Sequence, residues 1–129
     1  MTLRKVTLSE HDLRRFIKKH PSLKDVPINI VDGKPISLLD ARGLGKAIFS
    51  FPSDEEIWEL AIEYCLRICT KNPERKLFLM TKEGAVELSV IDRIEHLTRR
   101  TDIGKVLHRM YKTFLVQIFR WMEEVASRR

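Results

Sequence analysis

Residues 105–129, with the sequence KVLHRMYKTFLVQIFRWMEEVASRR, contain neither glycine nor proline. We predict one long C-terminal helix here, because nothing in this stretch would interrupt the intrahelical hydrogen bonds. The polar residues of this helix lie on a narrow arc, and its apolar residues cover the rest of the circumference. So wide an apolar face must be covered, either by another helix of the same chain or by a partner.

We expect the cover to be a partner, most simply a second copy of the chain in a two-fold dimer. The alternative, in which another helix of the same chain lies over this face, stays open at this point. The residues expected at the dimer interface share the apolar face of the predicted helix: Tyr111, Leu115, Ile118, Phe119 and Met122.

Two further helices are predicted upstream, each preceded by a serine that can cap its first turn. Ser9 begins an amphipathic stretch that ends at Pro21, with apolar residues on one side and four cations on the other. Ser53 begins a longer stretch that runs to about Thr70 and carries three acids in its first turn, where the positive end of the helix dipole favours them. We expect the helix after Ser53 to be the central core helix.

Strand patterns occur in the middle of the chain. Residues 27–39 predict a hairpin, because Asp32-Gly33 is a favoured turn pair between two β-rich runs. Residues 76–80, KLFLM, are typical of a short buried strand. Residues 82–99 alternate like a strand at first, but a helical spacing continues further along them, so we predict a helix there that is capped by Thr81.

These elements predict a single domain, residues 1–129, of the α+β class. We expect about four helices packed on one small sheet, in which the 27–39 hairpin pairs with strand 76–80. No apolar run reaches the ~20 residues that a membrane-spanning helix needs, so we expect no membrane segment.

The charge of the chain is unevenly distributed. The net charge is +6, with +5 over residues 1–52, −4 over residues 53–74 and +5 over residues 75–122. Two basic regions therefore flank an acidic one. Either the basic regions form one surface for a polyanion, or the opposite charges pair with one another.

We favour the polyanion surface, and so predict a non-enzymatic protein that binds DNA or RNA by neutralising backbone phosphates. A structural module, such as a small oligomerising subunit of a larger assembly, is the alternative. The predicted contacts come from two helices and one glycine-containing loop: Arg14, Arg15, Lys18, Lys19, Arg42, Lys46, Arg99, Arg100, Lys105, Arg109 and Lys112.

The segment RGLGKA, residues 42–47, superficially suggests a nucleotide site. A P-loop would need glycine where Asp40 stands and a hydroxyl where Ala47 stands, and a dinucleotide fingerprint would need glycine in place of Ile48. We therefore interpret the segment as a turn that carries Arg42 and Lys46. Asp92, Glu95 and His96 are the nearest approach to a ligand cluster, but adjacent helix positions diverge by about 100°. We expect no cofactor, no metal site and no enzymatic activity.

The two cysteines, Cys65 and Cys69, are four residues apart in a helical pattern, and a disulfide at that spacing would strain the turn. We expect reduced thiols in a cytoplasmic protein. A single glutamine and two asparagines, beside 33% charged residues, are typical of a thermophile-like composition.

Overall fold

The computed structural model describes residues 5–42 and 46–127 and confirms a helix-rich α+β fold. The N-terminal half begins with a strand that runs directly into a helix, followed by a short 3-10 turn and a hairpin. Its elements are β1 (Lys5–Ser9), α1 (Glu10–Lys19), η1 (Pro21–Leu23), β2 (Asn29–Val31), β3 (Lys34–Ile36), α2 (Leu38–Ala41) and β4 (Lys46–Ser50).

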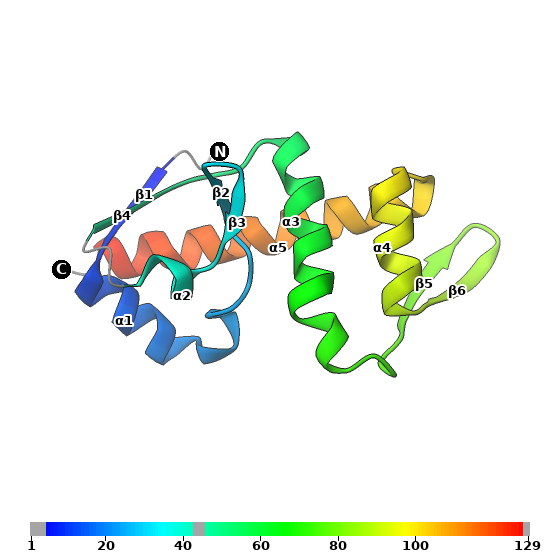
Figure 1. Ribbon diagram of the computed structural model, residues 1–129, viewed down its shortest axis with the longest axis horizontal. Helices are drawn as coiled ribbons and strands as arrows, with labels where there is room; N and C mark the ends of the chain where they lie inside the picture. The colour runs from blue at the N-terminus through cyan, green and yellow to red at the C-terminus, as the bar shows by residue number, and fades with distance from the viewer. Residues whose placement is uncertain (1–4, 43–45, 128–129) are drawn as a thin grey trace.

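The C-terminal half contains three longer helices and a second hairpin. Its elements are α3 (Asp54–Arg67), η2 (Cys69–Lys71), β5 (Leu77–Thr81), β6 (Gly84–Leu88), α4 (Val90–Arg99) and α5 (Asp102–Ser127). As Figure 1 shows, α5 runs along the long axis of the molecule, with α1 and the β1–β4 pair at one end and α4 and the β5–β6 hairpin at the other. The two ends of α5 therefore support different parts of the fold.

Serine caps begin four of the helices. At Ser9, Ser37, Ser53 and Ser89 the serine hydroxyl accepts the backbone N–H three residues on, and the side chain at that third position accepts the serine N–H. This reciprocal capping box satisfies backbone donors that would otherwise lack a partner. The caps predicted at Ser9 and Ser53 are confirmed.

The apolar face of α5 is covered by the chain itself. The helices α1, α3 and α4 and the strand β1 all pack on α5. All five residues predicted to form a dimer interface, Tyr111, Leu115, Ile118, Phe119 and Met122, are buried within the chain. The prediction of a dimer interface at these residues is therefore wrong, because other elements of the same chain cover the stripe.

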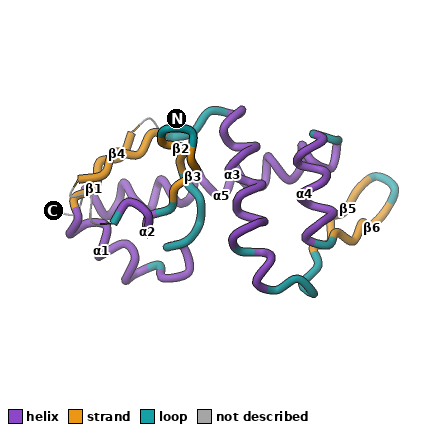
Figure 2. The backbone as a smooth tube through the Cα atoms, in the orientation of Figure 1, coloured by secondary structure: helices purple, strands orange, loops and turns teal. Residues whose placement is uncertain are grey.

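The strands form three separate antiparallel pairs, β1–β4, β2–β3 and β5–β6, as Figure 2 shows. The hairpin at Asp32-Gly33 is confirmed, and both residues adopt the positive φ angles that its turn requires. The strand predicted at 76–80 is present as β5, but it pairs with β6 and not with the 27–39 hairpin. The one small sheet that we predicted from the 27–39 hairpin and strand 76–80 is therefore not formed among the described residues.

The prediction of one helix over residues 82–99 is wrong in its first half. Residues 84–88 form β6, with Val86 paired to Leu79 and Leu88 paired to Leu77. The helix α4 begins only at Val90, because Ser89 caps it and Thr81 does not. The alternation at 86 and 88 and the helical spacing from 90 onward thus belong to two elements joined at Ser89.

The strands β1 and β4 were not predicted. They pair antiparallel, with Val6 opposite Phe49 and Leu8 opposite Ala47. Val6, Leu8 and Phe49 face the core. Asn29, also buried, donates its side-chain N–H to the Ser50 carbonyl at 3.0 Å and so joins the first hairpin to the end of β4.

Candidate functional site

Nine of the eleven cations predicted to bind nucleic acid fall into two groups near opposite ends of α5. The α1 group is Arg14, Arg15, Lys18 and Lys19, and the second group is Arg99, Arg100, Lys105, Arg109 and Lys112. The α1 group is held near the C-terminal end of α5, where His20 stacks on Trp121 with ring centroids 4.8 Å apart. The second group, residues 99–112, surrounds the N-terminal end of α5 (Figure 1). Lys105 and Trp121 are separated by about 24 Å along the helix axis, from a rise of 1.5 Å per residue. The two groups are therefore centred at different levels along α5.

Acidic side chains neutralise most of the second group. Arg100 donates to Glu55, with Nη1 to Oε2 at 3.0 Å, and Lys112 lies 2.8 Å from Asp54. These hydrogen bonds lower the pKa of both carboxyls. The acids belong to the first turn of α3, so the acidic and basic segments pair here. Two further ion pairs join residues that are close in the sequence, Arg99 with Glu95 and Lys105 with Asp102.

The α1 group is more open. Arg14, Arg15, Lys18 and Lys19 are all exposed, and only Arg14 forms an ion pair among the residues that the structure describes, with Glu10. Arg42 is exposed at the end of α2. Lys46 is the first residue of β4, and the Gly43–Gly45 part of the predicted turn lies outside the described residues. Arg109, the remaining member of the second group, is exposed on α5.

The ligand-like residues of α4 have structural roles. Asp92 accepts the Ser89 N–H in the helix cap, and Glu95 pairs with Arg99. His96 contacts the Thr101 hydroxyl at 2.7 Å. Within residues 5–42 and 46–127, no group of three or more histidine, cysteine, aspartate or glutamate side chains is arranged to hold a metal ion.

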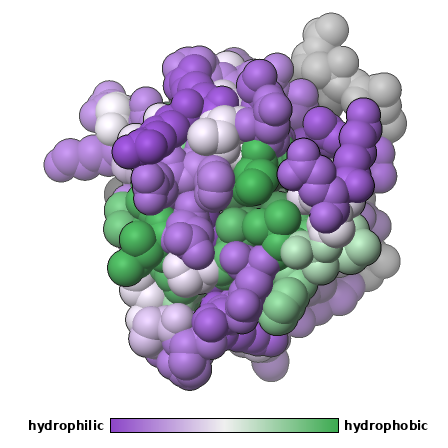
Figure 3. All heavy atoms as spheres, turned by 90° about the vertical axis from the view of Figure 1, so that its right-hand side faces the viewer, coloured by the Kyte–Doolittle hydropathy of each residue, from purple (hydrophilic) through white to green (hydrophobic). Residues whose placement is uncertain are grey.

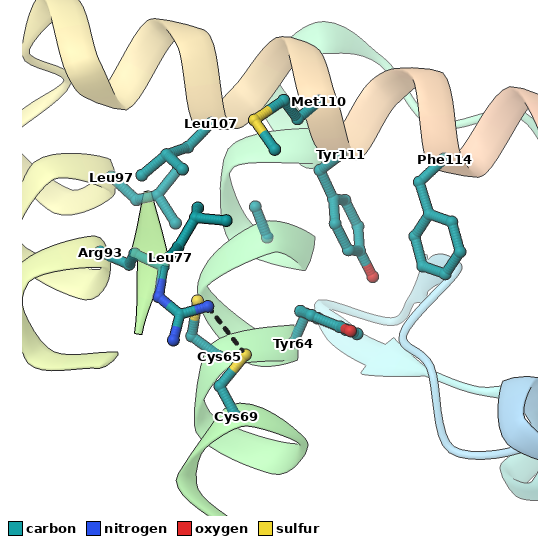
Figure 4. A pocket seen from close by; sticks show the side chains of 11 residues that line it. Tyr64, Cys65, Cys69, Leu77, Arg93, Leu97, Leu107, Met110, Tyr111 and Phe114 are labelled. Carbon is teal, nitrogen blue, oxygen red and sulfur yellow. Dashed lines mark hydrogen bonds between the residues drawn. The ribbon is translucent and has the colours of Figure 1, made fainter. Parts of the chain in front are cut away.

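A pocket of about 310 Å³ lies between α3, α4, α5 and β5. Its apolar wall is formed by Ala61, Leu77, Leu97, Leu107, Met110 and Phe114. Its other lining residues are Tyr64, Cys65, Cys69, Arg93 and Tyr111, and Figure 4 shows the Arg93 guanidinium directed at the Cys69 sulfur. A second pocket of about 400 Å³ adjoins it, because Tyr64, Cys69, Leu77 and Arg93 also line that pocket.

Cys65 and Cys69 lie beside one another on the wall of this pocket as free thiols, Cys65 buried and Cys69 partly exposed. A hydrogen bond from Cys65 and the nearby charge of Arg93, whose Nη1 lies 3.6 Å from the Cys69 sulfur, lower the pKa of Cys69 to about 6 against the effect of burial. The same pairing and burial raise the pKa of Cys65. We therefore expect Cys69, the more exposed of the two, to be the more reactive thiol.

The outer face of the β5–β6 hairpin exposes large apolar side chains. Phe78 is 66% exposed and Met80 is 81% exposed, while Leu77 and Leu79 face the core. Figure 3 views this end of the molecule and shows apolar residues across the middle of the face with hydrophilic residues around them. An apolar patch with a polar rim is typical of an interaction surface.

The sequence analysis predicted neither the pocket nor the exposed apolar face of the β5–β6 hairpin.

None of the helices in the described residues is long and apolar enough to cross a membrane. A scan of protein-family models, a search of curated proteins and a search of solved structures each found no significant match to this chain.

Proposed function

We propose that this protein is a self-associating structural module that binds a second copy of itself through the outer face of the β5–β6 hairpin. The observation that carries the proposal is the exposure of Phe78 and Met80 on one face of the hairpin. Side chains two residues apart on a strand point the same way, so both belong to one surface. Burying apolar surface contributes about 25 cal/mol for each Å² removed from water, which favours covering this face.

Charge and backbone both favour a second copy as the partner. The rim of the hairpin carries both signs, with Lys76 paired to Glu87 at 3.1 Å and with Lys82 and Glu83 at the turn. A balanced rim can meet an identical rim across a two-fold axis without like-charge repulsion. Each strand of the β5–β6 pair also has one edge without a neighbouring strand among the described residues, and such an edge can pair with another chain.

The test is the effect of Phe78→Ser with Met80→Ser on the oligomeric state. We expect the wild-type chain to sediment as a dimer at tens of micromolar and the double variant to sediment as a monomer. The dissociation constant should rise at least about 30-fold, because truncating even one buried interface anchor costs about 2 kcal/mol or more, and every 1.4 kcal/mol is a factor of about ten. Sedimentation equilibrium over a range of concentrations measures the change.

Ile48→Ser is the matched control, since Ile48 is 60% exposed on β4 at the other end of the molecule. This variant should dimerise like the wild type. A wild-type chain that stays monomeric at 100 µM, or a double variant that still dimerises, contradicts the proposal.

The exposed cations of α1 favour a second candidate function, binding of DNA or RNA through the phosphate backbone. Arg15, Lys18 and Lys19 are exposed and, among the described residues, form no ion pair, so their charge is available to a polyanion. This candidate keeps the α1 part of the predicted contact set. In this proposal the ion-paired cations of the second group contribute less to phosphate binding, because acidic side chains already neutralise them: Arg99, Arg100, Lys105 and Lys112.

Gel shifts with a 30-base-pair DNA and an RNA of the same length test the second candidate. Affinity should fall with rising salt, so the slope of log affinity against log salt is negative. Replacing Arg15, Lys18 and Lys19 with glutamine should reduce the magnitude of this slope by about 3, since each phosphate contact contributes about 0.9. The control replaces Arg99, Lys105 and Arg109 with glutamine and should change the slope less. Absence of binding at 50 mM salt, or affinity that does not fall as salt rises, rejects nucleic-acid binding.

We also propose a cytoplasmic location, because Cys65 and Cys69 are free thiols and reducing compartments keep thiols in that state.

A further inference from the structure

The pocket between α3, α4, α5 and β5 combines an apolar wall with an arginine, Arg93, that forms no ion pair with a carboxylate of the described residues. The Arg93 guanidinium donates to the Ser89 carbonyl at 3.3 Å, to the Arg75 carbonyl at 3.2 Å and to the Cys69 sulfur at 3.6 Å. Other arginines of the structure, such as Arg67, Arg99 and Arg100, pair with carboxylates. Arginine has five N–H donors, so donors of Arg93 remain for a further acceptor.

The charge around Arg93 favours an anion. Among the described residues that line the two adjoining pockets there is no aspartate or glutamate, whereas Arg75, Lys76 and Arg93 all line them. Glu87 pairs with Lys76 from outside the pockets, and a Cys69 thiolate can balance one further charge. One positive charge then remains for a ligand.

The remaining wall favours an apolar ligand body. Leu97, Leu107 and Phe114 line the pocket from α4 and α5, and Figure 4 shows Leu97 and Leu107 on the side of Arg93 and Phe114 on the far side of Tyr111. A volume of about 310 Å³ is within the range of roughly 300–1,000 Å³ in which proteins bind small molecules. Such sites are mostly apolar, with a few polar groups that orient the ligand.

We propose that this pocket binds a medium-chain aliphatic carboxylate, with the carboxylate against Arg93 and the hydrocarbon chain among Leu97, Leu107 and Phe114. A guanidinium pairs with a carboxylate through charge-assisted hydrogen bonds, which are stronger than those between neutral groups. The apolar wall favours the hydrocarbon chain and disfavours a short acid such as acetate. The inference does not depend on the dimer proposed above, because the hairpin's exposed face is opposite its pocket-facing side chains.

Titration calorimetry with octanoate and with octanol tests the inference. The wild-type chain should bind octanoate about tenfold more tightly than octanol. Arg93→Met should weaken octanoate binding at least tenfold and leave octanol binding within about twofold. Arg120→Met, at an exposed site on the distant part of α5, is the matched control and should bind both like the wild type. No octanoate binding to the wild type, or equal binding to Arg93→Met, overturns the proposal.

A second measurement uses the wild-type chain alone, because Arg93 also holds two backbone carbonyls and its replacement can disturb the fold. Octanoate at saturating concentration should slow alkylation of Cys69 by iodoacetamide at least fivefold, since the ligand would lie against the Cys69 sulfur. Acetate at the same concentration should not slow it. Equal alkylation rates with octanoate and with acetate also overturn the proposal.

Discussion

Replacing Gly104 with alanine is expected to lower the free energy of unfolding by about 3 kcal/mol. A Cβ atom at this position would lie 2.2 Å from the His96 carbonyl oxygen and 2.8 Å from its carbonyl carbon. Both are backbone atoms of α4, so α4 and α5 would have to separate to make room. Urea unfolding followed by circular dichroism measures the loss of stability.

The sign of this effect is informative, because glycine to alanine inside a helix ordinarily stabilises it by about 1 kcal/mol. Gln117→Ala, at an exposed position of the same helix, is the control and should change stability by less than about 0.5 kcal/mol. A Gly104→Ala variant as stable as the wild type would show that the two helices do not approach this closely.

The same substitution should also affect the pocket. Leu97 on α4 and Leu107 on α5 face each other across the corner at which Gly104 stands, and both line the pocket. Separating the two helices would open the apolar wall there. Gly104 therefore connects the stability of the α4–α5 corner with the shape of the candidate site.

Local signals made the helices predictable. Ser9 is followed three residues later by Asp12, and Ser53 by Glu56. Both serines cap their helices in the structure. The cap at Ser89 has the same form, with Asp92 three residues on. The Ser89–Asp92 motif therefore marks the boundary between strand and helix within residues 82–99.

The strand pairing and the cover of α5 depend on contacts between distant residues. The strand β1 pairs with β4 about 40 residues later in the chain, and no local pattern specifies that partner. The width of the apolar stripe on α5 correctly predicted that something covers it. Sequence periodicity does not distinguish cover by α1, α3 and α4 from cover by a second copy.

The candidate sites could not be predicted from the sequence for the same reason, because their residues are distant from one another in the chain. Lys112 and Asp54 are 58 positions apart, so a charge count by segment shows two opposite regions but not that they pair. Cys69, Arg93 and Leu107 line one pocket from η2, α4 and α5, respectively. The spacing of these residues in the sequence corresponds to no known motif, and only the packing of the helices brings them together.

Cys69 is expected to react with iodoacetamide at pH 6 about tenfold faster than free cysteine does. With its pKa lowered to about 6, about half of the Cys69 thiol is thiolate at that pH, whereas an ordinary thiol is almost fully protonated. The lower intrinsic nucleophilicity of a less basic thiolate offsets part of this advantage. The rate should level off above pH 7 and fall about tenfold per pH unit well below 6.

The alkylated site can be identified by mass spectrometry, because trypsin cleaves after Arg67 and leaves Cys65 and Cys69 on different peptides. Cys65, which is buried and has a raised pKa, should stay unmodified in the folded chain. Cys65→Ala and Arg93→Met should each move the midpoint of the Cys69 rate profile to higher pH, since each removes a group that stabilises the thiolate. Arg120→Met, far from the pocket, should not move it. A wild-type rate that keeps rising through pH 8 would mean that neither Cys65 nor Arg93 stabilises the Cys69 thiolate, and that Cys69 is an ordinary partly buried thiol.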